Sequence, residues 1–211
     1  MVNEDSDLYR AHPDWAIQIP GRKPFRSRNQ LLLDFSRKEV RDQVFEQICA
    51  VLDQGEIDYV KWDMNRSMAD VYAGNLTYDY VLGVYDFMER LTSRYPDMLL
   101  EGCSGGGGRF DAGMLYYFPQ YWTSDDTDAV ERLYIQYGTS MVMPSSSMGA
   151  HVSAVPNHQL GRTTPLVTRG HAAMSGQFGY ELDLASLTAD ELKTVSEQIK
   201  EFKAIRSIVH S

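Results

Sequence analysis

A short apolar run in the first third of the chain ends in three polar side chains whose types and spacing suit chemistry. Lys61, Asp63 and Asn65 follow Tyr59 and Val60, as expected when a buried strand delivers polar groups to a site at its tip. Residues two apart on a strand share a face, so these three side chains should point the same way. Lys61 would then keep Asp63 ionised, which is the state that a nucleophile needs. The alternative is a surface strand that ends in an ordinary ion pair.

A second stretch with chemical potential contains four consecutive glycines. It reads Glu101-Gly-Cys-Ser-Gly-Gly-Gly-Gly-Arg109. Because glycine lets the backbone approach a ligand closely, a phosphate cradle is one interpretation, and chain flexibility alone is another. No Gly-Lys-Ser/Thr follows the glycines, so the stretch is not a P-loop.

The third stretch, Trp122-Thr-Ser-Asp-Asp-Thr-Asp128, places three carboxylates within four positions. A helix N-cap with an acidic first turn explains the pattern without any function. A divalent-metal site is another option, with His151, His158 and His171 as further ligands. None of these histidines has the spacing of a metalloprotease motif, so we expect no metal ion.

Carboxylates on two different strand ends suit glycoside hydrolysis. One carboxylate attacks the sugar or activates water, and the other protonates the leaving oxygen. Asp63 and Asp125 are separated by enough chain for two βα units, so they would face each other across the mouth of a barrel. Asp125 lies next to Asp126, whose negative charge should help Asp125 to hold a proton.

The elements that must position these residues alternate between strand-like and helix-like segments. Capping-box patterns at Ser36 and Thr188 predict helix starts, and Thr77 is a further candidate cap. We expect helices over residues 36–55, 77–95, 130–137 and from 188 onward. We expect strands over residues 31–35, 58–63, 98–100, 121–123, 141–143 and 178–182, and residues 15–19 are a further candidate for a short strand within an N-terminal loop region.

Repeated strand–helix units with apolar strands predict an α/β fold with a parallel sheet. About six strands fit either an open doubly wound sheet or an incomplete (β/α)8 TIM barrel. Polar residues follow several different strands, at Asp34, Lys61, Glu101, Cys103 and Asp125. Barrel enzymes carry their chemistry at the carboxyl ends of several strands, so we favour the barrel, as a single domain over residues 1–211.

Composition excludes several classes of partner. The 211 residues are 43% hydrophobic, which suffices for one buried core, and 29 acidic against 20 basic residues give a net charge of -9. Nucleic acid and anionic membranes are therefore poor partners. No apolar segment is long enough to span a bilayer, and the N-terminus lacks signal-peptide features, so we expect a cytoplasmic location. Cys49 and Cys103 are expected to be thiols.

Four motifs, in this order along the chain, resemble the signatures of the glycoside hydrolase family 36 α-galactosidases. They are Tyr59-Val-Lys-Trp-Asp-Met-Asn-Arg66, Glu101-Gly-Cys-Ser-Gly-Gly-Gly-Gly-Arg-Phe-Asp111, Trp122-Thr-Ser-Asp-Asp-Thr-Asp-Ala129 and Gly149-Ala-His-Val-Ser-Ala-Val-Pro-Asn157. The resemblance implies a retaining mechanism at the mouth of a (β/α)8 barrel, without metal or organic cofactor. It makes Asp63 the nucleophile and Asp125 the acid/base.

The resemblance also implies sugar contacts and substrates. The matching sugar-binding positions are Arg28, Lys61, Asn65, Cys103, Ser104, Gly105 and Gly106. The loop at Cys103 and Ser104 matches the one near the C2 hydroxyl, which favours galactose over its N-acetyl derivative. Raffinose- and melibiose-type α-galactosides are the implied substrates, a homo-oligomer is the implied assembly, and raffinose synthase or α-N-acetylgalactosaminidase are minor variants.

The chain departs from the family pattern in length. Family members carry further β domains, and about six of eight βα units are expected here, with the first two strands missing. An open barrel exposes two sheet edges, so we expect weak or no activity from the isolated chain. Two other interpretations stay open: a non-catalytic sugar-binding fragment, and a metal-dependent α/β hydrolase.

Overall fold

The computed structural model describes residues 1–210, which form two compact units. The first unit covers Met1–Leu100, and the second begins at Glu101. Each unit has its own helices and strands. Among the described residues, no helix is both long and apolar enough to cross a membrane.

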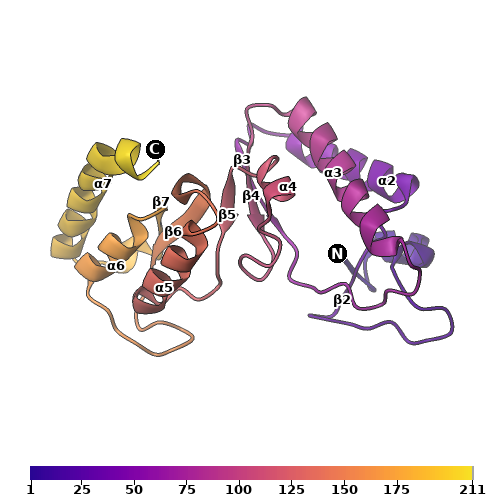
Figure 1. The fold of residues 1–211 in the computed structure, drawn as a ribbon, viewed down its shortest axis with the longest axis horizontal. Coiled ribbons are helices and arrows are strands. Elements are labelled where there is room, and N and C mark those ends of the chain that lie inside the picture. Colours follow the sequence, from indigo (N-terminus) through magenta and orange to yellow (C-terminus); the bar gives the residue numbers. More distant parts are fainter. Residues whose placement is uncertain (211) are drawn as a thin grey trace. The chain divides into compact units, whose positions relative to one another are not determined.

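The first unit consists of short strands and two long helices. Its elements are β1 (Val2–Asn3), α1 (Asp7–Ala11), a 3-10 helix (Pro13–Trp15), β2 (Gln30–Leu31), α2 (Lys38–Leu52), β3 (Tyr59–Asp63) and α3 (Leu76–Arg94). The strands β1 and β2 pair antiparallel. The helices α2 and α3 pack against each other (Figure 1).

The core of the first unit is built around the fully buried ring of Phe87 on α3. The ring centroids of Phe35, Phe45 and Trp62 lie 5.3, 5.7 and 5.4 Å from that of Phe87. Trp62 belongs to β3, so its packing fixes which face of this strand is turned inward. The opposite face, which carries Lys61 and Asp63, is therefore turned away from this core.

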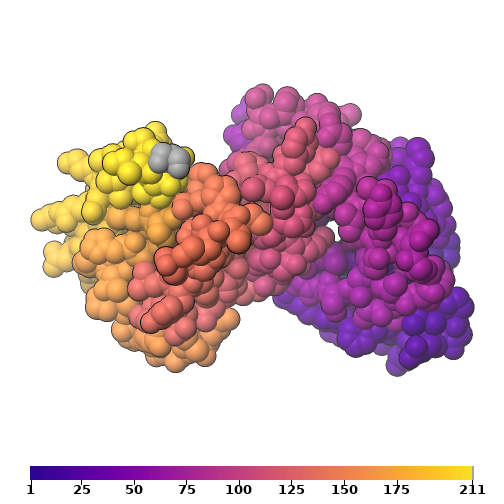
Figure 2. Space-filling model, in the orientation of Figure 1, coloured from indigo at the N-terminus to yellow at the C-terminus, as the bar shows by residue number. Residues whose placement is uncertain are grey.

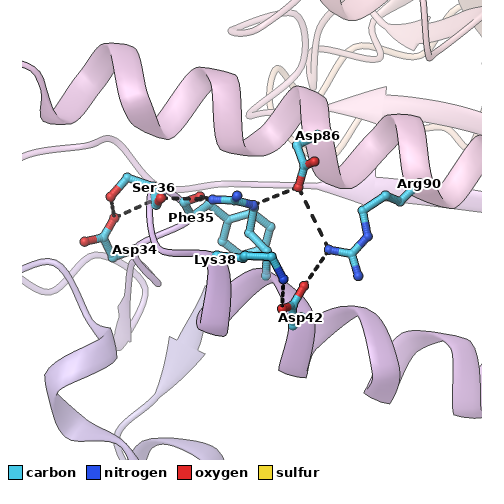
Figure 3. A network of polar contacts seen from close by, with 8 residues as sticks. Asp34, Phe35, Ser36, Lys38, Asp42, Asp86 and Arg90 are labelled. Carbon is cyan, nitrogen blue, oxygen red and sulfur yellow. Dashed lines mark hydrogen bonds and ion pairs between the residues drawn. The ribbon is translucent and has the colours of Figure 1, made fainter.

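A chain of ion pairs joins α2 to α3 on the surface. The Nζ of Lys38 lies 2.6 Å from Asp42, and Arg90 of α3 reaches the same carboxylate at 2.8 Å (Figure 3). The Nε of Arg41 lies 2.9 Å from Asp86. Partly exposed pairs of this kind each contribute about 0–1 kcal/mol, so the aromatic core rather than this network dominates the packing.

Gly83 lets α3 lie close to the backbone of Phe35, in the segment that precedes α2. A Cβ at this position would lie 1.8 Å from the carbonyl oxygen of Phe35, which accepts a hydrogen bond from Arg41 at 2.7 Å. We expect Gly83→Ala to lower the free energy of unfolding by about 2–3 kcal/mol, because the backbone at Phe35 or the helix α3 must shift to make room for the added methyl group. Urea unfolding followed by circular dichroism measures the change.

Gly138 provides the matched control for this substitution. It also lies within a helix, but a Cβ there would meet nothing within 4 Å. Gly138→Ala should therefore stabilise the chain by about 0.5–1 kcal/mol through helix propensity. Equal effects of the two substitutions would contradict the close approach at Gly83.

The second unit contains a parallel sheet. Its elements are β4 (Leu99–Cys103, from Glu101 on), α4 (Ala112–Leu115), β5 (Gln120–Trp122), α5 (Ala129–Ser140), two 3-10 helices (Ser145–Ser147, Leu184–Ser186), β6 (Met148–Ser153), α6 (Leu166–Ala173), β7 (Gln177–Glu181) and α7 (Ala189–Val209). The strand order is β4-β5-β6-β7 and all neighbours are parallel. The predicted α/β class with a parallel sheet is confirmed.

Helices cover this sheet. The helices α5 and α6 pack side by side and against β6, and α7 packs against α6 (Figure 1). In the space-filling view, the yellow surface of α7 adjoins the orange surface of α6 (Figure 2). Ala150 and Val152 of β6 form a buried cluster with Leu166, Ala173 and Val195. The Thr188 capping box at the start of α7 is confirmed.

Several expected elements differ from the structure. Residues 141–143 are not a strand, because α5 runs to Ser140 and the apolar side chains after it are exposed, with Val142 at 78%. The strand of this region is β6 instead. Residues 31–35 form a strand only at Leu31, and residues 15–19 make an isolated bridge from Ala16 to Leu33.

Two expected features at element ends also differ. Ser36 does not cap α2, because its hydroxyl donates to Asp34 and Arg37 occupies the cap position. The strand expected to end at residue 100 continues to Cys103. Glu101 is therefore an interior strand residue, completely buried, and accepts a hydrogen bond from Gln120 at 2.6 Å.

Candidate active site

The tip of β3 carries the first group of predicted site residues. Burial along this strand alternates, with Lys61 and Asp63 exposed and Trp62 half-buried. This is the alternation that the sequence predicts, since residues two apart share a face. The amide of Asn65 donates a hydrogen bond to the Oδ2 of Asp63. An exposed carboxylate and an amide donor that orients it therefore lie together at the end of this strand.

Residues after Asp63 anchor the tip of β3. Met64 is buried, and its sulfur accepts a hydrogen bond from the Tyr80 hydroxyl at 3.5 Å. Arg66 is also buried, and its guanidinium donates to the carbonyls of Gln30, at 3.0 Å, and Phe25. Burial lowers the pKa of Arg66. The segment after Asp63 is therefore tied to the loop that contains Arg28.

Arg28 lies at the tip of a tight hairpin between Ser27 and Gln30. The backbone φ angles of Arg28 and Asn29 are +54° and +59°, and Ser27 and Gln30 exchange backbone hydrogen bonds at 3.4 and 3.0 Å. Two consecutive left-handed residues define a type I′ turn, which normally uses Asn and Gly. An Arg at the first position is strained, and such strain often accompanies a binding role.

The glycine-rich stretch follows the end of β4 in the second unit. Cys103 is buried at the strand end, and Ser104 donates its amide to the Gly106 carbonyl at 2.8 Å. Gly105 and Gly106 have φ angles of +56° and +81°. A Cβ at Gly105 would meet nothing within 4 Å, whereas one at Gly106 would lie 2.6 Å from the Cα of Ser124. Gly106 thus serves backbone packing, and only Gly105 fits the interpretation of an open approach to a ligand.

Asp125 lies in the loop between β5 and α5, where its side chain is exposed. The loop is held by short-range hydrogen bonds: the amide of Asp126 donates to the Ser124 hydroxyl at 3.1 Å, and the amide of Asp128 donates to Asp126 at 2.9 Å. These turns hold the backbone on both sides of Asp125. Its carboxylate therefore extends from an ordered loop.

Asp128 confirms the capping interpretation for part of the acidic stretch. It is the N-cap of α5, and its Oδ1 accepts hydrogen bonds from Val130 and Glu131 at 3.0 and 3.2 Å. Arg162 also pairs with this buried carboxylate. The third carboxylate of the stretch is thus structural, which leaves Asp125 and Asp126 for chemistry.

The structure gives the metal-dependent interpretation no support. Across residues 1–210, no group of three or more His, Cys, Asp and Glu side chains is placed to hold a metal ion. His151 stacks on Trp122 at 4.8 Å, and His158 and His171 are exposed. The histidines thus serve packing or lie at the surface.

The predicted site residues fall into two groups, one in each unit. Lys61, Asp63 and Asn65 share the tip of β3, and the hairpin that contains Arg28 is hydrogen-bonded to the segment after this tip through Arg66. The second group follows β4 and β5, and consists of Cys103, Ser104, Gly105, Gly106 and Asp125. Sequence reasoning assigned no role to Arg66, although a lone Arg directly after an apolar strand and its polar tip is a usable signal.

Comparison with known proteins agrees with these motifs. The Melibiase family model matches residues 1–211. The bifunctional alpha-galactosidase/sucrose kinase AgaSK of Mediterraneibacter gnavus is 74% identical over 210 residues, which is 100% of this chain and 22% of that protein. Alpha-galactosidase Mel36A of Lactobacillus acidophilus is 55% identical over 216 residues, covering 99% of this chain and 30% of its own length.

Solved structures agree in backbone as well. The galactosidase domain of AgaSK superposes with a TM-score of 0.97, covering 99% of this chain and 29% of that one. A GH36 alpha-galactosidase, AgaA from Geobacillus stearothermophilus in complex with raffinose, superposes with a TM-score of 0.96 at 53% identity, covering 99% and 30%. The chain thus spans less than a third of each of these relatives, and it belongs to the Melibiase family, the GH36 α-galactosidases.

Proposed function

We propose that this chain carries the two catalytic carboxylates of a retaining α-galactosidase, with Asp63 as nucleophile and Asp125 as acid/base. The observation that carries the proposal is the placement of both side chains. Each is an exposed carboxylate at or just after the carboxyl end of a strand, in a chain of the GH36 family. Parallel α/β sheets present catalytic groups at that end of their strands.

The mechanism proceeds in two displacements. Asp63 Oδ attacks the anomeric carbon while Asp125 donates its proton to the departing glycosidic oxygen, so one C–O bond forms as the other breaks. Asp125, now a carboxylate, then removes a proton from water, and this water releases galactose from Asp63 with the α configuration retained. Asn65, which donates to the Oδ2 of Asp63, leaves the other carboxylate oxygen available for attack.

The substrates proposed are raffinose- and melibiose-type α-galactosides. Structures of the relative AgaA hold raffinose and stachyose, and both sugars end in an α-galactosyl unit. Lys61 and Arg28 would donate hydrogen bonds to the sugar hydroxyls, and the loop from Cys103 to Gly106 would face the C2 hydroxyl. The (β/α)8 barrel, its single domain, the homo-oligomer and the cytoplasmic location stay part of this proposal.

Product stereochemistry tests the retaining mechanism. Because the chain spans under a third of its relatives, activity is best measured in a chimera in which it replaces the matching segment of the AgaSK galactosidase domain, called here the AgaSK chimera. Proton NMR during raffinose hydrolysis should show α-galactose as the first product. β-Galactose as the first product would contradict the proposal.

The partial coverage favours a second candidate for the isolated chain. In this candidate, the chain, which matches 22% of the length of AgaSK, binds galactose without turning it over. We expect this isolated chain to hydrolyse a nitrophenyl α-galactoside weakly or not at all. Turnover by the isolated chain at about 1–1000 per second, the ordinary range for enzymes, would contradict this expectation.

Arg28 offers a prediction that separates stability from binding. Glycine pays no steric cost at a φ of +54°, so Arg28→Gly should raise the free energy of unfolding by about 0.5–1 kcal/mol. The same change should lower kcat/KM of the AgaSK chimera by roughly 10–100-fold, the value of one charge-assisted hydrogen bond. Thermal unfolding and galactoside kinetics measure the two effects.

Asn29→Gly is the matched control for Arg28→Gly. It relieves a similar φ angle in the same turn, although less is gained because Asn tolerates the left-handed region. It should leave kcat/KM unchanged. A loss of stability in Arg28→Gly, or an equal loss of activity in Asn29→Gly, would show that this account of the turn is wrong.

A further inference from the structure

The peptide bond between Ser124 and Asp125 is contacted by two other parts of the second unit, the side chain of Arg132 and the backbone at Gly106. We propose that Arg132 is a positioning residue for Asp125, and that it acts by holding this peptide against the backbone at Gly106. The proposal rests on the function above, in which Asp125 is the acid/base. It gives a role to a buried cation that neither the motifs nor the mechanism uses.

Arg132 projects from α5 into the interior, where only 3% of its surface is exposed. Its Nη1 donates to the Ser124 carbonyl at 2.9 Å, and its Nη2 donates to the Gly149 carbonyl on β6 at 2.6 Å. Its guanidinium also lies 4.5 Å from the ring centroid of Trp122 on β5. One side chain thus ties the loop before Asp125 to two adjacent strands.

Arg132 is itself held in one orientation. Its Nε donates to the Oε1 of Gln136 at 2.9 Å, one helical turn later on α5. The amide of Gln136 donates to the Ala172 carbonyl at 2.7 Å and to the Ser175 hydroxyl at 2.6 Å. Because a planar guanidinium with three fixed acceptors has little freedom, the Ser124 carbonyl is anchored to α5, α6 and β6 together.

Gly106 makes the second contact with this peptide. A Cβ at this position would lie 2.6 Å from the Cα of Ser124 and 3.0 Å from the amide nitrogen of Asp125. The neighbouring Gly107 donates its amide to the Thr123 carbonyl at 3.0 Å. The glycine-rich stretch and Arg132 therefore contact the same short segment, from Thr123 to Asp125.

This arrangement matters because the Asp125 side chain is exposed. Its position relative to a glycosidic oxygen therefore depends on its backbone, and small displacements of an acid/base sharply reduce proton transfer. Burial lowers the pKa of Arg132 to about 10, so the group stays charged at neutral pH. A charge-assisted hydrogen bond to the Ser124 carbonyl is stronger than a neutral one.

The test uses the leaving group as readout. In the AgaSK chimera, Arg132→Met should lower kcat/KM for raffinose by about 100-fold, the scale of general acid catalysis. Dinitrophenyl galactoside needs no proton on its leaving group, so its kcat/KM should change by less than about threefold. Arg132→Lys keeps the charge but not the planar set of donors. Its kcat/KM for raffinose should therefore lie between those of the unchanged chimera and Arg132→Met.

Arg169→Met is the matched control. Arg169 is also a buried arginine of the second unit, and it donates to the Ser153 and Thr164 carbonyls at 2.7 and 3.0 Å, away from Asp125. Its loss should lower stability without changing the ratio of the two kcat/KM values. Equal losses on both substrates in Arg132→Met, or the same change of ratio in Arg169→Met, would overturn the proposal.

Two further variants keep the test decisive. If Arg132→Met yields no folded protein, Gly106→Ala disturbs the same peptide at its contact with the glycine-rich stretch and should change the ratio in the same direction. An unchanged ratio would contradict the proposal. Asp125→Asn measures the proposed function separately. If Asp125→Asn itself treats both substrates alike, the acid/base assignment fails, whereas a change of ratio in Asp125→Asn alone contradicts only the role of Arg132.

Discussion

Replacing Asp63 by Asn is expected to abolish turnover of the AgaSK chimera. The amide cannot attack the anomeric carbon, so kcat for an activated aryl galactoside should fall by on the order of 10⁴-fold or more, as in other enzymes that lose a nucleophile. The side chain lies exposed at the tip of β3, so the change should hardly affect folding. Steady-state kinetics together with thermal unfolding measure both effects.

Asp58→Asn provides the comparison for Asp63. It changes an exposed carboxylate just before the same strand, and the backbone carbonyl that accepts a hydrogen bond from Leu99 at 2.8 Å is unaffected. This variant should keep full activity.

Azide rescue tests the same assignment. With Asp63→Ala, added azide should attack the anomeric carbon of the substrate directly and yield β-galactosyl azide. If Asp63→Asn keeps more than about a tenth of kcat, the nucleophile assignment is wrong.

The second large effect is expected at Asp125. Asp125→Asn should lower kcat/KM for raffinose by about 10²–10⁴-fold, the usual contribution of a general acid. Dinitrophenyl galactoside should still form the galactosyl-enzyme rapidly, giving a burst of dinitrophenol followed by slow turnover. Azide, which needs no general base, should restore that turnover and give α-galactosyl azide.

Asp111→Asn is the control for the change at Asp125. Asp111 caps α4 through an oxygen that accepts from Gly113 and Met114 at 2.9 Å, and Asn caps helices as well as Asp does. It should show neither a burst nor azide activation. If Asp125→Asn loses activity equally on both substrates and does not respond to azide, Asp125 is not the acid/base.

The side chains at the tip of β3 were predictable from local pattern. Alternation along a strand places Lys61 and Asp63 on one face, and the structure has both exposed with Trp62 turned into the core. The capping box at Thr188 likewise depends only on residues within one turn. Such features are predictable because period and capping are set by neighbouring residues.

The residues that hold the candidate site residues in place could not be predicted from the local sequence pattern. Arg132 reaches the Ser124 and Gly149 carbonyls only because α5 packs against β6. Gly106 was predicted only as part of a ligand-binding loop, and its close backbone packing against Ser124 is a further role that the sequence pattern did not reveal. The left-handed φ of Arg28 runs against its residue type. Each of these features depends on tertiary contacts, which override local preference.

Covalent trapping tests the central claim most directly. The AgaSK chimera is incubated with a fluorinated galactosyl fluoride, which forms the galactosyl-enzyme quickly and releases it slowly, and the labelled peptide is identified by mass spectrometry. The account predicts one adduct, on Asp63, that disappears in Asp63→Asn and accumulates in Asp125→Asn. Label on any other residue, or inactivation that leaves no covalent adduct, would contradict it.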